Sequence, residues 1–172
     1  MAINMLKFAH YMLCIAGICV AIYSLNVESQ ISSDPSSTYV PSCDLSAWAM
    51  SCSKVFKSSY SRILSHWTLV NHGSFLDLSL PQLALIYFGL LLIQPTVIFR
   101  SYRFIRVYRW LSYSAVCFNI YLGCILKFVL KELCIVCVSN YIINACLFLT
   151  VYYLNKRAGS AHEAARQAKK TS

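Results

Sequence analysis

Four long apolar runs constrain this chain more than any other feature of its sequence. A helix needs about 20 consecutive apolar residues to cross a bilayer. The runs cover residues 8–25, 80–99, 110–130 and 134–154 of a 172-residue chain, which leaves room for one sizeable loop over residues 26–79 and no second folded domain. We therefore expect an all-α membrane protein, a bundle of four transmembrane helices with a loop between the first two.

Charged residues are scarce and unevenly placed, which excludes an ordinary soluble enzyme. They make up 12% of the chain against 58% hydrophobic residues, whereas soluble domains carry roughly 25% charge. A formal net charge of +9 would suggest nucleic-acid binding in a soluble protein. Here the basic residues flank the apolar runs, so we expect contact with the lipid bilayer and none with nucleic acid.

The basic residues also predict which side of the membrane each segment faces. Lys and Arg near span ends collect on the cytoplasmic side, and an even number of spans brings both termini to one side. The loop 26–79 and the turn at residues 131–133 then face the lumenal or outer side. A lipid or nucleic-acid patch is the alternative interpretation of the arginines. The basic residues in question are Arg100, Arg103, Arg106 and Arg109 between runs two and three, and Lys156, Arg157, Arg166, Lys169 and Lys170 after run four.

Two runs and the terminus need separate interpretation. Run 8–25 is compatible with a signal peptide, but no small-residue cleavage site follows its core, so we predict a retained anchor. Run 80–99 contains Pro95, which a membrane helix tolerates when neighbouring groups satisfy the freed carbonyl.

We expect a membrane domain over residues 1–155 and a basic cytosolic tail over 156–172. That tail ends in Lys169-Lys170-Thr171-Ser172, which resembles the dilysine retrieval signal, so we expect a multi-pass protein of the endoplasmic reticulum membrane.

Nine cysteines fall into two groups once the spans are placed. Five lie inside spans, where cysteine usually packs as a small apolar residue. The other four share the non-cytosolic side, and two of them form the C-x-x-C motif of Cys134 and Cys137 at the start of the fourth helix. A helix N-terminus stabilises a thiolate, and residues three apart face the same side. We therefore expect a reactive dithiol there. The five cysteines inside spans are Cys14, Cys19, Cys117, Cys124 and Cys146.

Cys43 and Cys52 lie in the long loop and have three interpretations. A four-cysteine zinc site usually takes a second closely spaced pair, and these two are too far apart in sequence, so we expect no metal. Alone, they indicate a structural disulfide in an oxidising compartment. Because the dithiol of Cys134 and Cys137 lies at the same membrane face, the two loop cysteines could also form an exchange relay. Such a relay would pass electrons from soluble thiol proteins to that dithiol.

Apolar residues of the loop, such as Trp48 and Phe56, predict a lid that dips into the membrane interface. The aromatic side chains of Phe56, Tyr87, Phe88 and Tyr141 could border a flat apolar ligand at the mouth of the bundle. An interfacial aromatic belt is the alternative interpretation of Tyr87 and Phe88.

Taken together, these parts resemble the vitamin K epoxide reductases and their quinone-linked relatives. Their order and spacing cover nearly the whole chain. The matching stretches are Cys43-Asp44-Leu45, Cys52-Ser53-Lys54-Val55-Phe56, Phe128-Val129-Leu130, Cys134-Ile135-Val136-Cys137 and Tyr141-Ile142-Ile143-Asn144.

The resemblance implies a four-helix bundle that holds a quinone-like ring near its lumenal end. In this family pattern Cys137 faces the substrate and Cys134 receives electrons from Cys52, while Cys43 exchanges with a lumenal thioredoxin-like protein. Tyr141 resembles a tyrosine that hydrogen-bonds a substrate carbonyl, and Phe56 matches an apolar residue of the lid. The resemblance implies vitamin K quinone or epoxide as substrate and no tightly bound cofactor.

Two positions depart from the family pattern. The loop cysteines are one residue farther apart than in the nearest members, which a loop tolerates. An ungapped comparison places Leu80 where vertebrate members have an asparagine that donates to the substrate; Gln82 or a protonated Asp77 could replace it. A weakened carbonyl clamp would impair epoxide opening more than quinone reduction, because epoxide opening depends on stabilising developing negative charge.

The sequence therefore predicts a membrane oxidoreductase that reduces vitamin K epoxide, vitamin K quinone or both with the dithiol of Cys134 and Cys137. One alternative is quinone-linked disulfide generation for oxidative protein folding by the same relay. Another, from a different class, is a claudin-like four-span junction protein. That class carries tryptophan ahead of its loop cysteines, whereas Trp48 lies between Cys43 and Cys52, and it gives no reason for the C-x-x-C motif.

Overall fold

The computed structural model is mostly helical, and the part of the chain that it describes contains no strand. It describes residues 2–33, 41, 43–44, 51–68, 74, 77–97, 102–131 and 134–171. The elements are α1 (Ala2–Ser33), α2 (Cys52–Lys57), η2 (Ser59–Ser61), α3 (Ile63–His66), α4 (Leu80–Val97), α5 (Tyr102–Cys124), the π-helical η3 (Ile125–Leu130) and α6 (Ile135–Thr171).

Four of these helices are long and apolar enough to cross a membrane, which confirms the predicted four-helix bundle. The candidate spans are Asn4–Ser33, Leu80–Val97, Arg103–Leu130 and Ile135–Ala168. Their outer surfaces carry large apolar side chains such as Trp110, Ile120 and Ile142, each at least 60% exposed. A helix that is apolar on its outer face is suited to lipid.

Helices α1, α5 and α6 extend beyond the apolar runs that predicted them. Hydropathy marks only the length that matches the bilayer, whereas helix propensity continues into polar sequence. Thus α1 reaches Ser33, and α6 continues to Thr171 through an Ala-rich basic segment of good helix formers. Most of the expected tail, 156–172, is therefore a continuation of α6. Of the lid predicted within 26–79, Trp48 lies outside the described residues, and so does Arg100 of the basic group.

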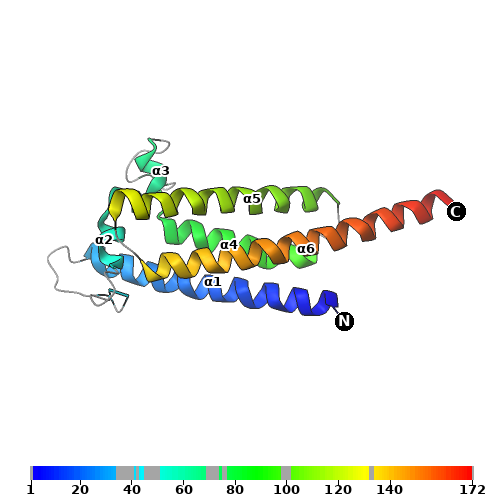
Figure 1. Cartoon of the computed structure of the whole chain (residues 1–172), viewed down its shortest axis with the longest axis horizontal. Helices are drawn as coiled ribbons and strands as arrows, with labels where there is room; N and C mark the ends of the chain where they lie inside the picture. The colour runs from blue at the N-terminus through cyan, green and yellow to red at the C-terminus, as the bar shows by residue number, and fades with distance from the viewer. Residues whose placement is uncertain are drawn as a thin grey trace.

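The four long helices pack side by side, with the short helices gathered at one end. Helix α1 packs against α4 and α6, and α5 packs against α6. Figure 1 shows both chain termini at one end, with α2 and α3 at the other.

Phe88 on α4 is fully buried against α1, where a Cβ on Gly17 would lie 2.6 Å from its ring. Glycine at position 17 therefore allows these two helices to pack closely.

Helix α4 continues through Pro95, as predicted, because a neighbouring helix satisfies the carbonyl that the proline frees. Proline has no N–H to donate to the carbonyl four residues earlier, which is that of Leu91. Nε2 of His10, fully buried on α1, donates to this oxygen at 2.7 Å, and its Nδ1 lies 3.2 Å from the hydroxyl of Thr150 on α6. His10 thus joins three of the four spans.

His10→Leu should therefore destabilise the bundle by about 1–3 kcal/mol, because the Leu91 carbonyl would be left buried and unpaired. Thermal unfolding of the purified protein in detergent measures the loss. Pro95→Ala supplies a matched background, since it restores the N–H within α4, and there His10→Leu should cost clearly less. An equal loss in both backgrounds would show that His10 does not act through this carbonyl.

Candidate active site

The structure brings together the four cysteines that the sequence singled out. Cys134 directly precedes α6, Cys137 lies in its first turn, and Cys52 is the first residue of α2. The sulfurs of Cys52 and Cys134, 82 positions apart in the chain, are 3.3 Å apart, and those of Cys43 and Cys52 lie within 4.8 Å of each other. All four are free thiols here. The sulfurs thus form a connected series from Cys43 through Cys52 to Cys134.

Asp44 fixes the position of Cys52. Its carboxylate accepts hydrogen bonds from the backbone N–H groups of Cys52 and Ser53, and from the Ser53 hydroxyl. These N–H groups lie at the start of α2, where helix donors lack partners and a negative charge is favourable. Because Asp44 directly follows Cys43, one residue holds both loop cysteines together.

Asp44→Ala should loosen this arrangement, because it leaves two N–H groups at the start of α2 without their carboxylate partner, and a hydrogen bond to a charged group is worth about 1.5–3 kcal/mol. In a Cys43→Ser/Cys137→Ser background, only Cys52 and Cys134 of the four remain. We expect Asp44→Ala to slow their oxidation to a disulfide several-fold, as measured by a gel shift after alkylation of free thiols. Ser51→Ala removes the N-cap contact to the N–H of Lys54 at 3.5 Å and a 3.2 Å contact to the Ser53 hydroxyl, but keeps the Asp44 carboxylate. It is the control and should change the rate little. Unchanged cross-linking in Asp44→Ala would contradict the role of the carboxylate.

Among the cysteines of this group outside the membrane spans, Cys134 is the one whose pKa is lowered. Hydrogen bonds from the thiols of Cys137 and Cys52, with the N–H groups that begin α6, lower the pKa of Cys134 against the opposing effect of burial. The hydrogen bond to Cys134, together with burial, raises the pKa of Cys52. Burial also raises the pKa of Cys43, partly offset by hydrogen bonds from Cys52 and Tyr23. A helix N-terminus was the predicted cause of a stabilised thiolate, and it contributes here beside the neighbouring thiols.

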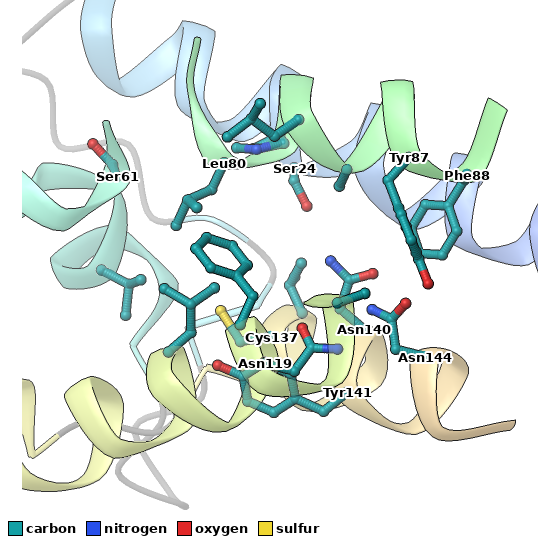
Figure 2. Close-up of a pocket in the computed structure, with 18 of the residues that line it drawn as sticks. Ser24, Ser61, Leu80, Tyr87, Phe88, Asn119, Cys137, Asn140, Tyr141 and Asn144 are labelled. Carbon is teal, nitrogen blue, oxygen red and sulfur yellow. The ribbon is translucent and has the colours of Figure 1, made fainter. Parts of the chain in front are cut away.

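A cavity of about 410 Å³ lies beside the cysteines, within the range of small-molecule sites. Cys137 is the member of the cysteine group that lines it, as Figure 2 shows. The walls come from α1, α4, α5, α6 and the segment of α2 and η2, and are mostly apolar and aromatic. An apolar ring with a few polar atoms fits such a lining. The apolar and aromatic lining residues are Val55, Phe56, Leu80, Pro81, Leu83, Ala84, Tyr87, Phe88, Leu111, Ala115, Phe118, Leu122, Val136 and Tyr141.

Four of the six predicted substrate-binding residues, Phe56, Leu80, Phe88 and Tyr141, line this cavity. Tyr87, for which an interfacial aromatic belt was the alternative interpretation, lines the cavity as well. Whether these side chains contact a substrate remains a prediction.

Asp77 and Gln82, the other two predicted residues, are not among the described residues that line the cavity. The Asp77 carboxylate forms an ion pair with Arg62 at 3.2 Å, and the Gln82 oxygen accepts the N–H of Ser79 at 2.9 Å. The second contact is half of a capping box at the start of α4. Both side chains therefore hold the N-terminal end of α4 in place.

Sequence reasoning missed the polar part of the lining. The amides of Asn119 on α5 and of Asn140 and Asn144 on α6 line the cavity, as does the hydroxyl of Ser24 on α1. A signal for them existed, because polar residues inside spans are costly and usually functional. Asn140 and Asn144 also follow Cys137 by three and seven positions, which is helical spacing.

A dithiol at the start of a membrane helix, contacted by a second cysteine pair and bordering an apolar cavity, provides the parts of a membrane thiol oxidoreductase. Comparison with known proteins gives the family. Residues 8–152 match the vitamin K epoxide reductase family. The chain is 32% identical over 140 residues to vitamin K epoxide reductase complex subunit 1 of Mus musculus, and 34% identical over 144 residues to the protein of the same name from Rattus norvegicus; each match covers 80% of this chain and 83% of the relative.

The chain therefore belongs to the vitamin K epoxide reductase family, and it is a multi-pass membrane oxidoreductase of that type. The resemblance inferred from the sequence is confirmed, and the claudin-like alternative is set aside.

Proposed function

We propose that this protein reduces vitamin K quinone and vitamin K epoxide in the cavity beside Cys137, using the dithiol of Cys134 and Cys137. The observation that carries the proposal is that the two cysteines of the dithiol have different neighbours. Cys137 lines the cavity, whereas Cys134 does not line it and has its sulfur 3.3 Å from the sulfur of Cys52. The names of the mouse and rat relatives support vitamin K as the substrate.

The reductive half of the proposed cycle begins with the proton of Cys137. The Cys134 thiolate, hydrogen-bonded to the Cys137 thiol, takes this proton as the Cys137 sulfur attacks the ring. Tyr141 donates a hydrogen bond to the ring oxygen on which negative charge develops. Cys134 passes this proton to the ring oxygen and, again a thiolate, attacks the Cys137 sulfur of the adduct, so the disulfide forms and the ring leaves with two electrons. A quinone takes up two protons and becomes a hydroquinone; an epoxide takes up two protons, releases water and becomes the quinone.

The dithiol is regenerated through the loop. Cys52 attacks Cys134 of the new disulfide and releases Cys137, after which Cys43 attacks Cys52 and releases Cys134. A leaving thiol with a lowered pKa departs faster, and Cys134 is the cysteine whose pKa is lowered. A thioredoxin-like thiol protein of the lumen then reduces the disulfide of Cys43 and Cys52.

The proposed location is the endoplasmic reticulum membrane, with both termini cytosolic. The position of both termini at one end of the bundle supports this topology (Figure 1). The basic end of α6 and the terminal Lys169-Lys170-Thr171-Ser172 support retrieval to that membrane. Replacing both lysines by serine should move part of the protein to the cell surface, where biotinylation of intact cells detects it.

Quinone-linked disulfide generation is the second candidate. Leu80 lines the cavity and neither Asp77 nor Gln82 does, which favours a quinone over an epoxide as the oxidant of the dithiol. Turnover of both compounds by membranes that contain the chain, with a small dithiol as reductant, tests the two candidates together. Turnover of the quinone alone would support the second candidate, and turnover of neither, measured against membranes without the chain, would overturn both.

A further inference from the structure

The side-chain amides that line the cavity have no role in the proposed catalytic cycle. Asn140 and Asn144 project from α6, and Asn119 from α5, around the space that Cys137 borders (Figure 2). Asn144 is 8% exposed, and the side-chain oxygens of Asn140 and Asn144 are both buried without a hydrogen-bond partner. Buried polar atoms are nearly always paired, because leaving one unpaired is costly. Two unpaired amide oxygens on one wall of a cavity indicate a site that a ligand completes.

Helix geometry aligns these two amides with the reactive cysteine. Residues 137, 140 and 144 are three and four positions apart, so they share one face of α6. At 1.5 Å per residue, Asn140 and Asn144 lie roughly 4.5 Å and 10.5 Å beyond Cys137 along the helix axis. A ring whose carbon meets the Cys137 sulfur therefore extends along the two amides.

The chemistry of the amide group selects the ligand. Its oxygen needs a donor, and a quinone or an epoxide carries only acceptors, whereas a hydroquinone carries two hydroxyl donors. A carboxamide presents an acceptor oxygen and a donor NH₂ on one planar group. A half rotation therefore lets the same side chain donate to a quinone carbonyl before the reaction and accept from the new hydroxyl after it.

We infer that Asn140 and Asn144 form a subsite that holds the ring oxygens of the bound quinone and of the hydroquinone made from it. The inference rests on the proposed function. In the step concerned, the Cys134 thiolate and the Cys137 thiol lose two electrons and one proton and become a disulfide, while the quinone gains the two electrons, that proton and a second proton from solvent and becomes the hydroquinone. The subsite holds the ring in its reduced and its oxidised form.

Binding of the ring without turnover is the test. In full-length Cys137→Ser protein in detergent, quenching of tryptophan fluorescence measures the affinity for vitamin K hydroquinone, kept reduced by excess dithionite, and for the quinone. We expect Asn140→Leu and Asn144→Leu each to weaken hydroquinone binding about tenfold or more, and quinone binding less. Asn140→Ser and Asn144→Ser, which keep a shorter polar group, serve if a leucine variant does not fold.

The matched control removes a buried amide pair between α4 and α6, away from the cavity. Gln94 and Asn155 contact each other at 3.4 Å and do not line the cavity. Gln94→Leu/Asn155→Leu removes both partners together, so no group is left unpaired, and it should leave binding unchanged. Equal hydroquinone affinity in the control and the Asn140 and Asn144 variants would overturn the subsite. That result is independent of whether the intact chain turns over quinone or epoxide, which decides the proposed function.

Discussion

Cys137→Ser should lower turnover of vitamin K quinone and epoxide by about three orders of magnitude or more, whichever reductant is supplied. Removing a nucleophile that reacts with the substrate is not compensated by the rest of a site, and losses of this size or larger are typical. Cys137 is the cysteine that lines the cavity, so no other sulfur of the group borders the ring. A serine hydroxyl keeps the volume but is not ionised at neutral pH.

Membranes containing the variant, with a small dithiol as reductant, provide the measurement. Cys146→Ser is the matched control, because Cys146 is an exposed cysteine on the same helix, outside the cavity and the cysteine group. It should retain full turnover. Cys134→Ser should also lose turnover, but it can accumulate the adduct between ring and Cys137, since no sulfur remains to resolve it. Activity that persists in Cys137→Ser would contradict the assigned nucleophile.

Much of the fold was predictable because bilayer thickness limits what a membrane chain can do. Four apolar runs gave four spans, and Pro95 did not divide the second. The reason Pro95 is tolerated was not predictable, because His10 lies 85 positions earlier in the chain and only the packed bundle brings it to the Leu91 carbonyl. The helix ends at Ser33 and Thr171 were also beyond a hydropathy argument, which detects the membrane core and not the helix.

The candidate site, too, was predictable only in part. Cysteines are few and chemically distinct, so their spacing and their side of the membrane predicted a group that the structure brings into contact. The partners of Asp77 and Gln82 depend on how the chain packs before α4, and sequence alone gave no means of separating a side chain that lines a cavity from one that holds a helix end. Asn140 and Asn144 were not predicted as lining residues, because only the packing of α6 against the other helices decides which of its faces borders the cavity.

Cys43→Ser should trap the protein with a disulfide between Cys52 and Cys134. These two sulfurs are already 3.3 Å apart, and a bond requires about 2.05 Å, so a small movement suffices. In the proposed cycle Cys52 attacks Cys134 first, and Cys43 is then the sulfur that releases it. Without Cys43 the intermediate persists, and turnover driven by a reduced thioredoxin-like protein should fall by about three orders of magnitude.

The double variant Cys43→Ser/Cys52→Ser separates the relay from the chemistry at the ring. It lacks the sulfur that forms the trapped bond, so no such species should be found by mass spectrometry of alkylated peptides. Protein-driven turnover should be lost as in Cys43→Ser, whereas a small dithiol that reduces Cys134 and Cys137 directly should sustain nearly full turnover. Loss of turnover with the small dithiol as well would show that the loop cysteines hold the site together and do not relay electrons; full protein-driven turnover would show that the relay does not pass through the loop.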